Sequence, residues 1–218
     1  MSGIAREPLA RQLQQGTVAM PGVTVEARER LLDYLAMLHR WNRIYNLSAV
    51  RAPRDMVVRH LLDSLAVLPH VRGASLLDVG SGAGLPGLPL ALCRSDLEVT
   101  LLDSNGKKAR FLRQVVAELG LGNVAVVQER AEAYRPPRTF DCIISRAYAR
   151  LDTFVRQVSA LLAPDGLLLA MKGRFNPVAE APGLEDRLQV VPLAVPGLAE
   201  ERCLVRLSAA AISGGGGR

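Results

Sequence analysis

A short loop rich in glycine constrains the fold of this chain more than any other feature. The heptapeptide Asp78–Gly84 (DVGSGAG) places a carboxylate before three closely spaced glycines. The apolar run Ser75–Leu77 precedes it, and the apolar run Leu85–Leu92, which contains two prolines, follows it. This pattern predicts a buried strand, a tight turn and a helix whose first turn tolerates proline. Glycine adopts positive φ and lets a ligand approach the main chain, so such a turn predicts a site for a nucleotide-like cofactor.

Beyond this loop the chain alternates between strand and helix patterns. Segments rich in apolar residues predict strands at 75–79, 98–102, 124–128, 140–145, 166–171, 188–193 and 202–207. Helical patterns fall at 85–92, 106–119 and 151–162. Alternation of this kind predicts an α/β fold with a mostly parallel, seven-stranded sheet and helices on both faces. This Rossmann-like arrangement is the usual platform of class I methyltransferases. Because no clear helix separates the last two strands, we expect a hairpin with an antiparallel edge strand.

A short helical extension is predicted before the first strand. Thr24 is a plausible N-cap, and apolar residues recur at helical spacing from there to Trp41, which we expect in the core. A second helix is predicted over 53–68, where a local hydrogen bond between His60 and Asp63 is expected. Residues 1–22 carry turn formers and little periodicity. The predicted organisation is an N-terminal helical extension packed on the core (1–72), a methyltransferase domain (73–208) and a disordered Gly-rich tail (209–218).

Composition narrows the class of protein. Hydrophobic residues make up 49% of the 218 residues, which is enough for a sizeable core. No apolar run approaches the roughly 20 residues of a membrane span, and the N-terminus lacks the apolar centre of a signal peptide, so we expect a cytoplasmic protein. Cys93, Cys142 and Cys203 lack metal-ligand spacing, which predicts reduced thiols and no metal site. The net charge of +6 favours an anionic partner such as nucleic acid without establishing one.

The glycines by themselves leave the identity of the cofactor open. Residues 82–87 also satisfy the G-x-G-x-x-G pattern of dinucleotide enzymes. Asp103, at the end of the second predicted strand, suits either cofactor because a carboxylate there can bind a ribose diol. Asp78 would repel a pyrophosphate but would attract the cationic amino-acid end of S-adenosylmethionine. Pro86 removes an N–H donor that a pyrophosphate would use. Together these residues favour S-adenosylmethionine.

Two later segments extend the predicted site. After the third strand, Glu132 is a candidate for the exocyclic amine of adenine, with the Ala131 backbone beside it; a solvated loop carboxylate is the alternative. The fourth strand ends in Ser145-Arg146-Ala147, where the methyl acceptor is expected. Enzymes that methylate exocyclic base amines usually carry a Pro-Pro turn there, and those that make 5-methylcytosine need a nucleophilic cysteine nearby; this chain has neither.

What remains is an acceptor that already carries a usable lone pair, and guanine N7 fits because it needs no base. In-line placement of the reacting atoms can then supply most of the acceleration, on the order of 7–11 kcal/mol. We therefore expect no catalytic triad. Arg146 is expected to position the cofactor or the acceptor rather than to move a proton.

An ordered series of motifs resembles the bacterial RsmG (GidB) family, which methylates guanine N7 in 16S ribosomal RNA of the small subunit. The resemblance runs from about Leu31 to Leu207 and rests on segments 41–51, 59–64, 78–90, 102–104, 108–112, 145–147 and 171–173. It implies an rRNA (guanine-N7)-methyltransferase that uses S-adenosyl-L-methionine and acts on 16S rRNA or the small ribosomal subunit, with no membrane and no metal.

Loop residues and positions that match the family's motifs make up the predicted cofactor site. They are Asp78, Gly80, Gly82, Gly84, Leu85, Asp103, Ser104, Ala131, Glu132 and Arg146. Cations neutralise RNA phosphates and an aromatic ring can stack on an exposed base, so residues near the expected substrate mouth are candidates for RNA contact. These are Lys107, Lys108, Arg110, Tyr148, Lys172 and Arg174. For each cation, a solvated or intramolecularly paired side chain is the alternative.

Three other functions stay open from the residues themselves. A small-molecule methyltransferase would share the fold but transfer the methyl group to metabolites. An NAD-dependent oxidoreductase would bind NAD in preference to S-adenosylmethionine. A non-catalytic RNA-binding protein would keep the fold and transfer no methyl group.

Overall fold

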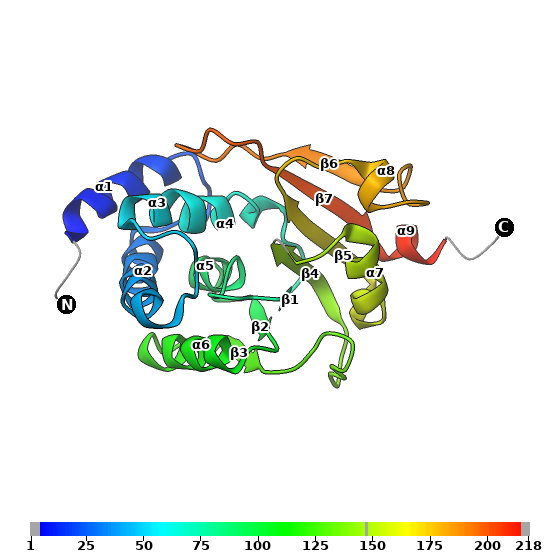
Figure 1. Cartoon of the computed structure of the whole chain (residues 1–218), viewed down its shortest axis with the longest axis horizontal. Helices are drawn as coiled ribbons and strands as arrows, with labels where there is room; N and C mark the ends of the chain where they lie inside the picture. The colour runs from blue at the N-terminus through cyan, green and yellow to red at the C-terminus, as the bar shows by residue number, and fades with distance from the viewer. Residues whose placement is uncertain (1–4, 147, 215–218) are drawn as a thin grey trace.

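A seven-stranded sheet runs through the part of the chain that the computed structural model describes, residues 5–146 and 148–214 (Figure 1). Its strands are β1 (Ser75–Val79), β2 (Glu98–Leu102), β3 (Val124–Val127), β4 (Phe140–Arg146), β5 (Leu162–Lys172), β6 (Gln189–Pro192) and β7 (Cys203–Ser208). They lie in the order β3-β2-β1-β4-β5-β7-β6. Neighbouring strands from β3 to β5 are parallel, whereas β7 runs antiparallel to β5 and β6. The predicted fold, including the terminal hairpin, is confirmed.

The strand boundaries follow the predictions closely, with one larger difference. β5 begins at Leu162, where the sequence predicts a strand only from residue 166. The extra residues pair with the start of β4, since Phe140 lies opposite Leu162 before the register shifts to Cys142 opposite Leu167. This irregular pairing has no signature in the apolar pattern, which is interrupted by Pro164 and Asp165.

Helices precede the sheet and connect its strands. They are α1 (Arg6–Thr17), α2 (Val25–Tyr45), α3 (Pro53–Met56), α4 (Asp63–Leu65), α5 (Gly87–Cys93), α6 (Gly106–Glu118), α7 (Leu151–Val158), α8 (Pro177–Glu180) and α9 (Ala209–Ser213). A π-helix (Val57–Leu62) joins α3 to α4, and two 3₁₀ turns follow at Leu68–His70 and Ser159–Leu161. The predicted N-cap of α2 is confirmed, because the Thr24 hydroxyl oxygen accepts a hydrogen bond from the Ala27 N–H at 3.0 Å.

The first helix, α1, occupies a segment in which the sequence shows only turn formers and little periodicity. Pro8 lies in the first turn of α1, where its missing N–H leaves no hydrogen bond unmade. Gly16 lies in the last turn, and a Cβ there would come within 2.5 Å of a Leu62 methyl carbon. Both residues therefore serve the helix and its packing rather than a turn.

The predicted second helix is helical but not uniform. The chain is helical from Pro53 to Leu65, and its middle turn is the π-helix. The Asp63 N–H donates to the carbonyls of both His60 and Val58, and the second of these bonds spans the five residues of a π turn. Such turns occur frequently at functional sites.

Two hydrophobic clusters cover the two faces of the sheet. Alternate residues of β1 divide between them, with Leu76 in one and Leu77 in the other. The first cluster also contains buried residues of the N-terminal helices, such as Leu13 and Leu31, together with Leu88 of α5. The N-terminal helices thus share a core with one face of the sheet, while the predicted domain boundary at residue 72 stays a prediction.

The C-terminal segment is ordered further than expected. Residues 209–213 form α9, and the Ser208 hydroxyl accepts from the Ala211 N–H at 3.1 Å, so the predicted disorder is wrong for this part. The remaining tail residues, 215–218, lie outside the described residues, as does Ala147. None of the described helices is both long and apolar enough to span a bilayer.

Candidate cofactor and acceptor site

The Gly-rich loop lies at the carboxyl end of β1 and adopts a conformation that requires glycine. Gly80, Gly82 and Gly84 have φ angles of 70°, 59° and 92°, which side chains rarely permit. The N–H groups of Gly80 and Ser81 both donate to the Leu102 carbonyl, at 2.8 and 3.1 Å. The loop is therefore tied to the end of the neighbouring strand β2.

Asp78 lies beneath this loop and is fully buried. Its Oδ2 accepts from the Gly87 N–H at 2.9 Å, at the start of α5, whereas its Oδ1 has no partner among the described residues. Burial raises the pKa of the Asp78 carboxyl to about 7, although the Gly87 bond and the nearby Arg146 lower it. Asp78 is therefore a structural support of the loop that keeps one unused acceptor atom.

Asp103, just after β2, holds the loop in place through hydrogen bonds. Its Oδ2 accepts from the Gly82 N–H at 2.9 Å, and its Oδ1 accepts from the Asn105 N–H at 2.8 Å. The Lys108 ammonium lies 3.6 Å from Oδ2. Lys108 is thus paired with a carboxylate inside the site, which is the intramolecular alternative to its predicted contact with RNA.

A cleft of about 360 Å³ opens beside these residues, within the size range of small-ligand sites. Five of the predicted cofactor residues line it: Gly80, Asp103, Ser104, Ala131 and Glu132. Val79, Leu102, Lys108, Glu129, Arg130 and Tyr148 complete the lining. The structure thus gathers residues that follow three neighbouring strands, β1, β2 and β3, into one cleft, as expected where parallel strands end together.

The other loop residues shape the turn and do not line the cleft. The Gly82 N–H is bonded to Asp103, as described above. Leu85 is 4% exposed and belongs to the core. A Cβ on Gly84 would come within 2.3 Å of Leu88 and 2.9 Å of Leu112. Glycine at this position is required for packing as well as for its positive φ.

Glu132 and Tyr148 have partners within the protein. A Glu132 carboxylate oxygen accepts from the Gln157 amide of α7. The Tyr148 ring packs edge-on against Phe154, with ring centroids 5.6 Å apart, and a Cβ on Gly80 would lie 2.6 Å from it. Tyr148 therefore belongs to the same cleft as the predicted cofactor residues, whereas the sequence places it against RNA.

A larger cleft of about 640 Å³ also includes Glu132 in its lining. It shares only Ala131 and Glu132 with the smaller cleft, and its remaining lining comes from residues 135–139 and from Arg156 to Leu161. It contains no residue of the Gly-rich loop. For that reason the smaller cleft is the candidate cofactor site.

Arg146, at the end of β4, lies in a network of charges that the sequence does not predict. Its Nη1 donates to Asp63 Oδ2 at 3.1 Å and to the Arg59 carbonyl at 2.9 Å. The other Asp63 oxygen accepts from Arg202 Nε, also at 3.1 Å. Asp63 is 2% exposed, so two arginines from different strand ends share one buried carboxylate.

His60 bonds to Ser48, not to Asp63. The distance from Ser48 Oγ to His60 Nε2 is 2.8 Å, and His60 Nδ1 has no partner among the described residues. Burial and the charge of Arg146 lower the pKa of His60 to about 4, so its ring is neutral at physiological pH. The predicted bond is not formed, because Asp63 instead accepts from Arg146 and Arg202. Trp41 packs on Tyr45 and Phe111 at the edge of the core, as predicted.

The other candidates for RNA contact fall into two groups. Lys172 is largely buried, and its ammonium donates to the Ala149 carbonyl at 2.7 Å and to Glu180 at 2.6 Å. It therefore holds segments of the protein together, which is the intramolecular alternative to its predicted contact with RNA. Lys107 and Arg110 are exposed on α6, and Arg174 is 92% exposed, 3.4 Å from Glu201. These three remain accessible to a large partner.

The cysteines carry no chemistry at this site. Cys142 is buried within β4, and burial raises its pKa to about 12, so it is a protonated thiol. Burial raises the pKa of Cys93 to about 12 as well. Among the residues the structure describes, no group of three or more His, Cys, Asp and Glu side chains is arranged to hold a metal ion.

Comparison with known proteins identifies the family. A family model described as rRNA small subunit methyltransferase G (GidB) matches residues 27–205. The chain belongs to this family. The resemblance noted in the sequence is thereby confirmed, and with it the prediction of an rRNA methyltransferase over an NAD-dependent oxidoreductase.

Relatives in the methyltransferase G family align over nearly the whole chain. The protein named ribosomal RNA small subunit methyltransferase G from Alkalilimnicola ehrlichii is 51% identical over 215 residues, which cover 96% of this chain and 97% of that protein. The protein of the same name from Chromohalobacter salexigens is 57% identical over 187 residues, covering 85% and 89%.

Solved structures support the fold. The S-adenosylmethionine-dependent methyltransferase SibL in its apo form matches with a TM-score of 0.57 and 18% identity, over 93% of this chain and 74% of that chain. A SAM-dependent methyltransferase from Aquifex aeolicus matches with a TM-score of 0.51 and 19% identity, covering 68% and 90%. At these identities the likeness concerns the fold alone, and it confirms the predicted class I methyltransferase architecture.

Proposed function

We propose that this protein transfers the methyl group of S-adenosylmethionine to N7 of a guanine in 16S rRNA of the small ribosomal subunit. The observation that carries the proposal is the single cleft that unites Gly80, Asp103, Ser104, Ala131 and Glu132. It lies at the carboxyl ends of the parallel strands, beside the end of β4 that carries Arg146. Membership of the methyltransferase G family supports the substrate class.

The described residues fit S-adenosylmethionine. Asp103 and Ser104 line the cleft with oxygens suited to a ribose diol, and Glu132 offers a carboxylate to the adenine amine. Asp78 does not line the cleft, and its contribution is to hold the Gly-rich loop through the Gly87 N–H. When bound, S-adenosylmethionine supplies an electrophilic methyl group on a sulfonium centre. Gly82, Gly84 and Leu85 contribute by holding the loop, and Arg146 by positioning the reactants.

The groups near the end of β4 suit an acceptor that needs no deprotonation. Asp63 is engaged by two arginines, His60 is bonded to Ser48, and Cys142 is buried. In the proposed reaction the N7 lone pair forms the new bond to the methyl carbon as the carbon–sulfur bond breaks, and its electrons return to sulfur. The positive charge passes from sulfur to the guanine ring, and no proton moves. Orientation is then the main contribution of the protein.

We further propose that the protein works in the cytoplasm, where small ribosomal subunits are found, and that exposed cations contact the RNA. Lys107, Arg110 and Arg174 are the accessible candidates from the sequence. Tyr148, which lines the cofactor cleft, is the candidate for stacking on a base that enters beside the cofactor.

The decisive experiment is methyl transfer from labelled S-adenosylmethionine to unmodified 16S rRNA, to small subunits and to a pool of small metabolites. We expect label in rRNA, and 7-methylguanosine at one position after nuclease digestion and mass mapping. Label confined to small molecules would contradict the substrate, and a methylated base other than 7-methylguanine would contradict the proposed acceptor atom.

A further inference from the structure

Two segments of the chain are rich in cations and free of acids. Residues 34–54 contain four arginines and no Asp or Glu, and residues 104–117 contain four Lys and Arg residues and no Asp or Glu. The first covers the C-terminal half of α2 and the loop after it, and the second covers most of α6. They are far apart in the sequence, so composition alone does not combine them.

The fold places these two segments side by side (Figure 1). Trp41 of α2 packs on Phe111 of α6 with ring centroids 5.5 Å apart, and Arg30 donates to the Leu119 carbonyl at 2.7 Å. An early residue of α2 thus lies beside the end of α6, and a later one lies nearer its start. Residues from both halves of α2 therefore contact α6.

Five cations are exposed on this helix pair, and we call them the α2–α6 face: Arg40, Arg43, Lys107, Arg110 and Arg113. Only Arg40 has a carboxylate within 4.0 Å among the described residues, that of Glu118 at 3.7 Å. Ile44, 71% exposed, lies next to Arg43. The face therefore carries a net positive charge that the rest of the described chain does not neutralise.

The α2–α6 face borders the site. Helix α6 begins just after Ser104, which lines the cofactor cleft. Helix α2 leads into the loop whose Ser48 bonds His60, on the helical segment that also holds Arg146 through Asp63. A chain lying along this face would therefore enter the site between the cofactor cleft and the end of β4.

We infer that the α2–α6 face binds the sugar-phosphate backbone of the rRNA next to the target guanine. This inference rests on the proposed function and adds the side from which the RNA approaches. Clustered Arg and Lys without intervening acids suit phosphates, since each contact releases counterions from the RNA. A protein partner of the usual kind would instead require an apolar centre, and next to these cations the described residues offer Ile44 as a strongly exposed large apolar side chain.

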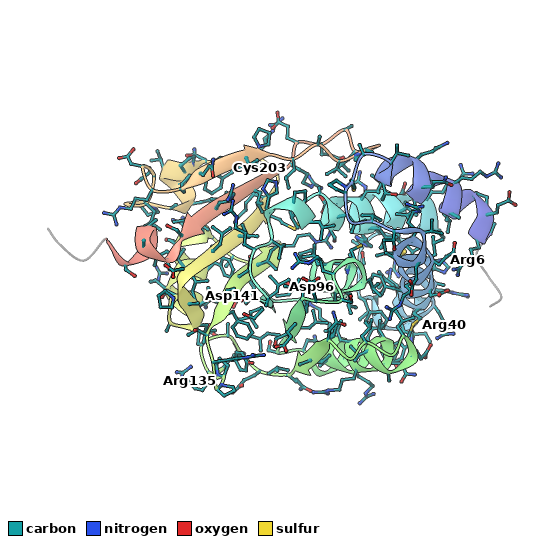
Figure 2. The ribbon with its side chains drawn as sticks, turned by 180° about the vertical axis from the view of Figure 1, so that it is seen from behind. Arg6, Arg40, Asp96, Arg135, Asp141 and Cys203 are labelled. Carbon is teal, nitrogen blue, oxygen red and sulfur yellow. The ribbon has the colours of Figure 1, made fainter. Side chains whose placement is uncertain are left out.

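The test compares two triple variants with the same change in charge. Arg43→Gln, Lys107→Gln and Arg110→Gln together alter the face. Arg11→Gln, Arg138→Gln and Arg156→Gln form the control, because these arginines are 67%, 67% and 68% exposed in surface ion pairs on other elements. Figure 2 shows Arg40 on the side of α2 and α6, and Arg135, near Arg138 in the sequence, at the opposite side of the molecule.

Binding of the full-length, S-adenosylmethionine-saturated protein to unmodified 16S rRNA and to small subunits is measured between 50 and 300 mM KCl, on the order of the range where phosphate contacts dominate. We expect the face variant to lose about tenfold or more in RNA affinity, and its slope of log affinity against log salt to become shallower by roughly 2–3. The control variant keeps most of the affinity. Cofactor affinity, measured by calorimetry, stays at the wild-type value in both.

Equal losses in the two variants would overturn the inference, since net charge would then explain them. A loss seen with intact subunits but not with protein-free rRNA would also overturn it, because a ribosomal protein would be the partner. If the wild-type protein binds rRNA through this face but transfers no methyl group, the proposed function is wrong. The inference that this face binds RNA would still hold.

Discussion

Asp63 shows how one buried carboxylate organises side chains from three parts of the chain. It accepts from Arg146 after β4 and from Arg202 just before β7, while lying itself at the start of α4. Because Asp63 is buried, we expect its substitution to be destabilising: an arginine that loses its partner in a buried place leaves an uncompensated charge. Asp63 is thus a positioning residue for Arg146.

Replacing Asp63 should misplace Arg146. We expect Asp63→Asn to lower the rate constant for methyl transfer by about 10- to 100-fold through lost orientation of the reactants. The double variant Asp63→Asn with Arg146→Ala should be no slower than Arg146→Ala alone, because both changes act on one unit. Single-turnover kinetics measure this. Asp55→Asn, on the exposed surface of α3, is the matched control, and fully additive losses would contradict the assignment.

Two buried titratable groups close to Arg146 have opposite effects on the pH dependence of stability. The folded pKa of Asp78, about 7, is above its ordinary 3.8, so its stabilising contribution is present at low pH and is lost as pH rises toward 7. The folded pKa of His60, about 4, is below its ordinary 6.5, so its contribution is present above pH 6.5 and is lost as pH falls toward 4. Between about pH 4 and 7 the two contributions offset each other.

Single substitutions should expose the two opposing slopes. In Asp78→Asn, acidification from pH 7 to 4.5 should reduce the free energy of unfolding by about 3 kcal/mol more than in the wild type. In His60→Gln, the same acidification should reduce the free energy of unfolding by about 2 kcal/mol less than in the wild type. Urea unfolding of the ligand-free proteins at several pH values measures both. If the free energy of unfolding depends on pH in the same way in the wild type and in both variants, neither group titrates as its burial implies.

At the scale of elements, short helical pieces place the site residues. Asp63, directly after the π-helix, accepts from arginines at the ends of two strands, and Glu180 of α8 accepts from Lys172. Lys172 also donates to the carbonyl of Ala149, in the segment that follows β4 and carries Tyr148. This buried cation ties together the end of β5, α8 and the loop at the acceptor side.

The structural role of Lys172 can be separated from RNA binding. We expect Lys172→Met to lower the free energy of unfolding by about 2–3 kcal/mol, because it leaves Glu180 and the Ala149 carbonyl without a partner. The salt dependence of rRNA binding should stay unchanged, whereas losing a phosphate contact would reduce its slope by about 1. Arg174→Gln, at a 92% exposed residue, should leave stability within about 0.5 kcal/mol of the wild type. A shallower salt slope in Lys172→Met would restore its predicted contact with RNA.

At the scale of the whole molecule, the N-terminal helices and the sheet share one hydrophobic core. Trp41, the only tryptophan, packs between α2 and α6, and the buried Tyr34 hydroxyl donates to the Ala83 carbonyl in the Gly-rich loop at 2.8 Å. Loss of the helical extension would therefore disturb the loop itself. The extension supports the site as well as covering the sheet.

Unfolding should accordingly be a single transition. We expect tryptophan fluorescence, which reports the α2–α6 contact, and far-UV circular dichroism, which reports the whole molecule, to give the same urea midpoint. A fluorescence transition at a lower urea concentration than the circular-dichroism transition would show that the helical extension unfolds separately, as an independent domain would.

The sequence by itself determined the strands, the helices between β1 and β5, and the family, because these depend on local periodicity and on contiguous motifs. Alternating apolar runs set the positions of β1 to β7, and the DVGSGAG loop with the later motifs pointed to a methyltransferase. The sequence did not predict α1, because its proline and glycine look like turn formers although both residues are allowed at helix ends and at packing sites. The sequence did not predict the first residues of β5, because they are a strand only through their pairing with β4, and no local sequence pattern indicates that pairing.

Only the tertiary structure decided which charges are free and which are paired. Lys108 and Lys172 look like Lys107 in the sequence, but their partners, Asp103 and Glu180, come close only through the fold. The acid-free segments of α2 and α6 likewise form one surface only when the helices pack. The loop at Asp78–Gly84 is a cofactor signal in the sequence, whereas the structure buries its carboxylate as a support. Electrostatic pairing depends on distances of a few ångströms between remote residues, and a linear sequence does not contain those distances.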